Sequence, residues 1–277
     1  RPDLKNLFDT MRHLPGVSDV FVRDSLPPGV SVADVTPSGT ADGPQAQRLV
    51  ADLRAVDAPA PVLVAGPAAE LVDAKRSVVA RLPAALAIIV LATGVLLFAL
   101  TGSVVVPVKA IVMNLLTLLA TMGVLVAVFQ WGWGAGVLGF EPWGALDLTT
   151  PLLLFVFAFG LSMDYEVFLL ARIKEEWDRR TSNDRAANDR AVLAGITATG
   201  PVVTTAALAI GIVFLGFVLG DLVAVKEIGV GMAVAVLLDI TVVRGLLLPA
   251  TMSLLGRWNW WRPGRTAEAQ APQVSMR

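Results

Sequence analysis

The sequence contains no cysteine, one histidine and one tyrosine among its 277 residues. Without cysteine, disulfide bonds, thiolate metal ligands and cysteine nucleophiles are excluded, and redox chemistry gives no information about the compartment. The H-E-x-x-H, Walker, nucleophile-elbow and Rossmann patterns are also missing from the sequence, so we expect neither an enzyme nor a metal or organic cofactor. We expect the single histidine, His13, at an exposed helix position and not as a ligand.

Charge is scarce as well. Charged residues make up 16% of the chain, hydrophobic residues make up 55%, and the formal net charge is -1. The mean hydropathy of +0.69 is too high for a soluble globule and is typical of a multi-pass membrane protein. A net charge of this sign argues against nucleic acid as a partner, since phosphate binding requires clustered Lys and Arg. The chain starts with Arg1 instead of methionine, and we expect it to be a piece of a longer protein.

Residues 1–76 have mixed polarity and short periodic segments. Helical spacing is found in LKNLFDTMRHL and QAQRLVADLRAV, whereas VSDVFV, VSVADV and PVLVAG resemble strands. Proline and glycine pairs between these segments are typical of turns. This part of the sequence therefore predicts a small, incomplete α/β domain outside the bilayer.

Residues 77–256 contain long apolar stretches, each near the length of roughly 20 residues that a membrane-spanning helix needs. The five stretches lie at about 82–100, 104–130, 148–170, 201–219 and 228–248. The predicted fold class is thus an α-helical multi-pass membrane bundle of five spans, preceded by the small α/β domain and followed by a tail at 257–277.

The distribution of Lys and Arg predicts the orientation of these spans. The segment between the third and fourth stretches and the tail are basic, whereas the loop at 131–147 has no Lys or Arg; the basic residues are Arg172, Lys174, Arg179, Arg180, Arg185, Arg190, Arg257, Arg262 and Arg265. By the positive-inside rule, the tail is cytoplasmic, residues 1–76 lie outside, and the protein belongs to the plasma membrane. Trp258, Trp260 and Trp261 resemble an interfacial anchor, although they are equally compatible with a tail that simply ends the helix.

Asp164 and Tyr165 are adjacent within the third apolar stretch. A charge in a membrane helix costs about 2.5 to 3.5 kcal/mol on insertion scales, and acidic side chains in such positions commonly belong to proton relays. A carboxyl group that loses its water can change its protonation with its surroundings, and a neighbouring phenol can donate to the charged form or accept from the neutral one. We therefore select Asp164 and Tyr165 as candidate proton-relay residues. A purely structural, hydrogen-bonded role for Asp164 is the alternative.

Gly160 and Glu166, on the same predicted helix, are candidate supporting residues near the relay. Gly160 precedes Asp164 by one helical turn and would allow another helix to approach, so we expect Asp164 to face protein and not lipid. Tyr165 should face a different neighbour, about 100° further round the helix. Whether Glu166 is interior or reaches the cytoplasmic interface stays open.

The fifth stretch contributes Asp239 and Arg244, which are also candidate supporting residues. Five residues apart on an α-helix, they are poorly placed to pair with each other, so we expect each to pair with another helix or to extend toward the interface. The remaining intramembrane polar residues are expected to form interhelical hydrogen bonds. They are Lys109, Asn114, Thr204 and Thr205.

The segments FGLSMDYEVFLLARIKEEW, TGPVVTTAALAIGIVFLGF and VAVKEIGVGMAVAVLLDITVVRGLLLPA resemble the C-terminal half of the mycobacterial membrane protein large family, within the resistance-nodulation-division transporters. The resemblance covers all five stretches and, more weakly, residues 1–76. It implies two pseudo-symmetric halves, each with a periplasmic porter domain, and export of lipids or other hydrophobic compounds driven by the proton gradient.

By the same resemblance, Asp164 and Tyr165 form one half of a proton relay, with protons as the coupling ion. Their partners would be an Asp-Tyr pair in an N-terminal half, and no second Asp-Tyr dipeptide occurs in this sequence. The expected partners are thus that missing half, membrane lipids and a hydrophobic substrate. Two alternatives stay open, a proton-driven accessory to protein secretion and a truncated, non-transporting membrane scaffold.

Overall fold

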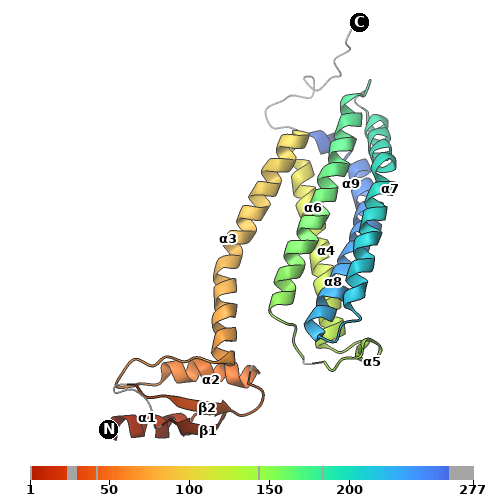
Figure 1. Ribbon diagram of the computed structural model, residues 1–277. Helices are drawn as coiled ribbons and strands as arrows, with labels where there is room; N and C mark the ends of the chain where they lie inside the picture. Colours follow the sequence, from red (N-terminus) through yellow and green to blue (C-terminus); the bar gives the residue numbers. More distant parts are fainter. Residues whose placement is uncertain (1, 24–29, 42, 143, 183, 262–277) are drawn as a thin grey trace. The chain divides into compact units, whose positions relative to one another are not determined.

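The computed structural model describes residues 2–23, 30–41, 43–142, 144–182 and 184–261, which divide into two compact units after Ala87 (Figure 1). The first unit contains helix α1 (Pro2–Arg12), strand β1 (Val17–Val22), strand β2 (Ala33–Pro37) and helix α2 (Pro44–Ala55). The two strands pair antiparallel. Apolar side chains from both helices and the hairpin form a small core; its buried members are Leu7, Met11, Val20, Leu49 and Leu53.

The predicted strand at 61–66 is absent from this unit. The segment has no regular secondary structure, and Leu63 is 95% exposed. A strand needs a hydrogen-bonding neighbour, and among the described residues the only sheet is the β1–β2 pair. A short run of apolar residues was therefore not sufficient to form a strand here.

Helix α3 (Pro67–Thr101) begins well before the predicted start of the first span. Its first turns are tied to α2 within the first unit, where Arg54 contacts both carboxylate oxygens of Asp73 at 2.7 Å and Lys75 donates to Gln47 at 2.8 Å. Pro83 lies inside the helix. Proline removes one backbone hydrogen bond, but apolar membrane helices tolerate it more readily than soluble ones.

The second unit is built around long helices that pack side by side (Figure 1). Helix α4 (Val105–Leu125) continues into a short π-helix, η1 (Val126–Gln130), and a loop with the single-turn helix α5 (Ala135–Leu138) leads to helix α6 (Thr149–Asp178). Helix α7 (Arg185–Phe217) follows, and it contains Pro201, where the sequence had suggested a helix start.

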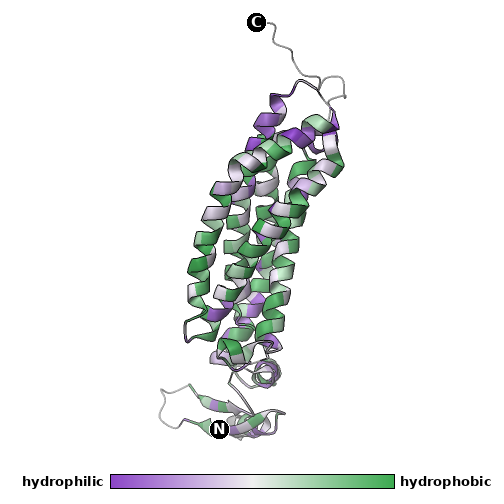
Figure 2. Ribbon diagram, turned by 90° about the vertical axis from the view of Figure 1, so that its right-hand side faces the viewer, coloured by the Kyte–Doolittle hydropathy of each residue, from purple (hydrophilic) through white to green (hydrophobic). Residues whose placement is uncertain are grey.

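The last span is continuous and consists of four successive helical segments of different types. Helix α8 (Val223–Leu238) runs directly into a second π-helix, η2 (Asp239–Leu247), then into α9 (Leu248–Leu255) and the 3-10 helix η3 (Gly256–Trp260). Among the described residues, five helices are long and apolar enough to cross a membrane, as predicted. Figure 2 shows the hydrophobic residues distributed along the sides of these helices and hydrophilic residues concentrated near the Asp178–Arg185 end.

Two apolar cores fill the bundle, one toward each end. The first contains Met113, Ile173, Trp177, Met252 and Trp260, among others. The second contains Leu125, Phe129, Leu154 and Met232, among others. Three buried polar residues lie between the members of the two cores along their helices, namely Asn114 on α4, Ser162 on α6 and Asp239 on η2. Other buried polar residues, among them Thr150, Lys226 and Glu227, lie near helix ends.

Trp260 does not lie at the surface as an interfacial anchor would. Its side chain is 6% exposed, stacks on Trp177 with ring centroids 5.3 Å apart, and donates to the Asn188 side chain at 3.2 Å. Trp258 and Trp261 are exposed, and a role for them as an anchor at the membrane interface stays a prediction. Arg262 and Arg265 lie outside the described residues, and His13 is exposed just after α1.

Candidate functional site

Helix α6 carries Asp164, Tyr165 and Glu166 in succession, and because an α-helix turns by about 100° per residue their side chains point in three directions. Asp164 is exposed in the described chain, Tyr165 is partly buried, and Glu166 is 4% exposed. The open question about Glu166 is therefore answered in favour of the bundle interior.

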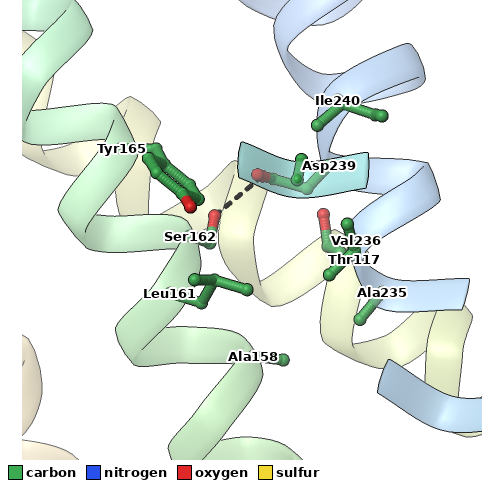
Figure 3. Close-up of a pocket in the computed structure, with 10 residues that line it drawn as sticks. Thr117, Ala158, Leu161, Ser162, Tyr165, Ala235, Val236, Asp239 and Ile240 are labelled. Carbon is green, nitrogen blue, oxygen red and sulfur yellow. Dashed lines mark hydrogen bonds between the residues drawn. The ribbon is translucent and has the colours of Figure 1, made fainter. Parts of the chain in front are cut away.

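Tyr165 lies on a different side of α6 from Asp164 and contacts η2. The guanidinium carbon of Arg244 lies 5.2 Å from the centre of the Tyr165 ring, within the range of a cation–π contact. Tyr165 also lines a cavity of about 10 Å³ together with Thr117, Ser162 and Asp239 (Figure 3). A polar cavity of this size accommodates about one water molecule.

Asp239 and Arg244 form an ion pair with each other, with Arg244 Nε 2.8 Å from Asp239 Oδ2. The prediction that they are poorly placed to pair was wrong because the chain is a π-helix from Asp239 to Leu247. In a π-helix the backbone hydrogen bonds join residues five apart, so the side chains of residues five apart lie near each other. π-Helical segments are frequent at functional sites.

Ser162 connects this ion pair to α6. Its hydroxyl donates to Asp239 Oδ1 at 2.8 Å (Figure 3). Its backbone carbonyl accepts a hydrogen bond from Arg244 at 2.7 Å. The other half of the prediction, that each charged residue pairs with another helix, is thus confirmed. The buried Asp239–Arg244 pair and Tyr165 are held as one unit across α6 and η2.

Glu166 adds a second buried carboxyl group near this unit. It interacts electrostatically with Lys109 of α4 and with Arg244 and Asp239 of η2. Lys109 is 9% exposed, and its ammonium group has no hydrogen-bond partner among the described residues. The group around Glu166 therefore consists of two acidic and two basic side chains, Glu166, Asp239, Lys109 and Arg244.

Comparison with known proteins identifies the family of this chain. The sequence pattern of the MMPL family matches residues 30–275. The chain belongs to the MMPL family. Its match with the membrane protein SCO6666 of Streptomyces coelicolor is 48% identical over 242 residues, which is 87% of this chain and 34% of that protein.

Two mycobacterial relatives carry more specific names. The heme uptake protein MmpL11 of Mycobacterium tuberculosis is 42% identical over 204 residues, covering 74% of this chain and 20% of that protein. The trehalose monomycolate exporter MmpL3 of the same species is 40% identical over 233 residues, covering 83% of this chain and 24% of that protein. The MMPL chain described here thus spans about a third or less of the length of these curated relatives.

The prediction that a neighbouring helix covers Asp164 is not met within the described residues. Gly160 and Asp164 are both exposed, and a Cβ atom added at Gly160 would meet no atom within 4 Å. The face of α6 that carries the candidate relay carboxyl group is therefore uncovered in this segment of the MMPL protein.

Several expected interhelical hydrogen bonds are also absent. Asn114 is 2% exposed, yet neither its amide oxygen nor its amide nitrogen has a partner among the described residues. Thr204 and Thr205 are exposed, and the Thr205 hydroxyl donates to Pro201 of its own helix. Intrahelical bonding by threonine is common because its hydroxyl can reach the carbonyl one turn earlier.

Ser162 and Thr117 were not predicted as site residues, although both line the cavity at Tyr165. Serine and threonine are common in apolar helices, so their occurrence alone carries little signal. The described residues contain no group of three or more His, Cys, Asp or Glu side chains that could hold a metal ion.

Proposed function

We propose that this chain is the C-terminal segment of a plasma-membrane transporter that exports lipids or other hydrophobic compounds and is driven by the proton-motive force. Membership of the MMPL family supports the class of protein. The name of the relative MmpL3, a trehalose monomycolate exporter, supports a lipidic substrate. In this proposal the basic ends of α6 and α7 and the C-terminal tail face the cytoplasm, in accordance with the positive-inside rule.

The observation that carries the proposal is the exposed Asp164 carboxyl group inside an apolar membrane helix. Exposure to lipid would cost about 2.5 to 3.5 kcal/mol, so the exposed face of α6 requires a polar cover from outside this segment. An Asp-Tyr pair on the matching helix of an N-terminal half would supply hydrogen-bonding groups at this place. The uncovered Gly160 would allow that helix to approach closely.

In the proposed cycle, Asp164 binds and releases the coupling proton and Tyr165 orients it. A phenol can donate to a charged carboxylate and accept from a neutral carboxyl group, although the Tyr165 ring lies on a different side of α6 from Asp164, beside Arg244. One charge that crosses about 100 mV releases about 2.3 kcal/mol, and each pH unit across the membrane adds about 1.36 kcal/mol. One or two protons per cycle are therefore enough for moderate uphill transport.

The test is the Asp164→Asn variant of the intact transporter that contains this segment, reconstituted in vesicles with an imposed pH gradient. Export of a labelled glycolipid should lose its dependence on the gradient, because the amide cannot exchange a proton. Asp221→Asn is the matched control, since Asp221 is an exposed aspartate in the loop between α7 and α8. Normal gradient-dependent export by Asp164→Asn would remove Asp164 from the relay.

A second candidate function is transport of heme, because the relative MmpL11 is named a heme uptake protein. The same vesicles, loaded in parallel with heme and with the labelled glycolipid, separate the two substrates. Gradient-dependent movement of heme without movement of glycolipid would favour heme transport. A lack of gradient-dependent movement of either compound would contradict both candidates.

A further inference from the structure

Buried polar atoms without a hydrogen-bond partner occur on several helices of the bundle, and Glu166, one of the residues that carry them, interacts electrostatically with two others, Lys109 and Arg244. The described residues with such atoms include Lys109 and Asn114 on α4, Glu166 on α6 and Arg244 on η2. All four side chains are at least nine-tenths buried. Polar groups in protein interiors are nearly always hydrogen-bonded to protein or to ordered water, so a cluster of unpartnered atoms indicates a site for internal water.

The charges of this cluster are incompletely paired. Arg244 and Asp239 contact each other at 2.8 Å, but Lys109 and Glu166 are not in salt-bridge contact although they interact electrostatically. Two buried charges that do not touch lose much of their hydration without gaining a direct hydrogen bond. Water between them would restore these hydrogen bonds, and the cavity beside Tyr165 and Asp239 shows that the neighbouring packing leaves room of that size.

We propose that Lys109, Asn114, Glu166 and Arg244 surround a hydrated proton-holding site in the bundle, in which Glu166 binds the proton and Lys109 is its counter-charge. This inference rests on the proposed proton-driven function and adds a second titrating carboxyl group to Asp164. A proton delivered by internal water forms an O–H bond with the Glu166 carboxylate. The net charge of the four ionisable groups, Lys109, Glu166, Asp239 and Arg244, then rises from zero to plus one. When that bond breaks, the proton returns to water and the net charge returns to zero.

The surroundings of Glu166 contain few other titratable groups. Lys109 faces it from α4, and Asp239 and Arg244 face it from η2. Asp164 and Tyr165 precede it on its own helix, and α7 has no titratable side chain between Ala191 and Phe217. On α8, Lys226 and Glu227 lie toward the opposite end, where Lys226 donates to Leu138 and Glu227 accepts from the Asp147 backbone. Of the two carboxyl groups in this cluster, Asp239 is in direct contact with a basic side chain and Glu166 is not.

The experiment is infrared difference spectroscopy of the intact transporter in lipid, between alkaline and acidic buffer, which detects the C=O band of a carboxyl group that gains a proton. The Glu166→Gln variant should lose one such band. Glu227→Gln is the matched control, because Glu227 is also a buried glutamate of the bundle, 2% exposed, but lies outside the cluster. The Glu227→Gln variant should keep the band.

If the Glu166→Gln variant shows all the carboxyl bands of the native protein, the inference is overturned. If Glu166→Gln does not fold, Glu166→Asp keeps a carboxyl group in a changed position, and an unshifted band would have the same consequence. Asn114→Leu should displace the water and lower gradient-dependent export roughly tenfold, a change of about 1.4 kcal/mol in the barrier. Export by Asn114→Leu at the normal rate and with the normal pH profile would contradict the hydrated site.

The two proposals fail in different ways. If Asp164→Asn exports normally, the relay role of Asp164 is lost, while the infrared band still reports whether Glu166 binds a proton. If Asp164→Asn abolishes coupled export but Glu166→Gln keeps both the band and the rate, only the second proton-holding site is wrong.

Discussion

Arg244 Nε lies 2.8 Å from Asp239 Oδ2, although the two residues are five apart in the chain. The contact exists because the backbone is π-helical from Asp239 to Leu247. A regular α-helix would turn the two side chains to different faces, since facing pairs on an α-helix are three or four residues apart. The helix type, and not only the residue types, therefore creates the buried ion pair beside Tyr165.

Removal of one member of this pair should be more harmful than removal of both. Arg244→Ala leaves the Asp239 carboxylate buried without its cation, and breaking a buried pair costs about 3–5 kcal/mol. The double variant with Asp239→Ala should recover much of this loss. Thermal unfolding of the four proteins in one detergent gives the coupling energy. Additive losses in the double variant would show that the pair is not coupled.

The Ser162→Ala variant tests the link between α6 and η2. It removes the hydroxyl that donates to Asp239 and leaves a buried acceptor short of one hydrogen bond, a loss of about 1–3 kcal/mol. Thr205→Val is the control, because the Thr205 hydroxyl is exposed and bonds only to Pro201 among the described residues. The melting temperature should fall for Ser162→Ala and stay nearly constant for Thr205→Val. Equal melting temperatures would refute the link.

Gly195 marks the closest approach of α6 and α7. A Cβ atom at Gly195 would lie 3.1 Å from the Ile173 Cα atom and would also collide with the Ile173 side chain. Because the backbone of α6 cannot yield easily, Gly195→Ala should destabilise the bundle by about 1–3 kcal/mol. Gly211→Ala on the same helix meets no atom within 4 Å and should be neutral or stabilising. Denaturant titration of both variants measures the difference, and equal stability of the two would contradict the close packing.

Asp184 should make the stability of α7 dependent on acid pH. Its side chain caps the helix by accepting from the Ala187 backbone, and this bond, followed by one from Ser182, lowers the pKa of Asp184 below its ordinary value. With a lower pKa in the folded state, the contribution is fully present above the unfolded pKa of about 3.9 and is lost as the pH falls through the folded pKa.

An Asp184→Asn variant should therefore lose this part of the acid dependence, because asparagine caps helices without titrating. Helix content followed by circular dichroism from neutral to acid pH measures the effect. Asp221→Asn, at an exposed loop position, should leave the acid profile unchanged. An identical acid profile for the native protein and Asp184→Asn would show that the cap does not titrate.

The five membrane helices were predictable because each apolar stretch approaches the thickness of the bilayer, and that signal is local. The helix ends were less predictable, since α3 and α7 begin well before Leu82 and Pro201, where the sequence predicted the starts of these spans. Asp164 and Tyr165 were found from the sequence because polar residues are rare in such stretches. The segment at 61–66 is the opposite case, because its apolar residues predicted a strand but no neighbouring strand pairs with it among the described residues.

From its sequence alone, the chain is determined to be a multi-pass membrane protein with Asp164 and Tyr165 adjacent in its third apolar stretch, since both follow from composition and from neighbouring residues. Only the tertiary structure decided that Asp164 is uncovered, that Glu166 is interior near Lys109, and that Asp239 pairs with Arg244 through a π-helix. These relationships depend on helix rotation and packing between segments far apart in the chain. The spacing of residues along one helix does not contain that information.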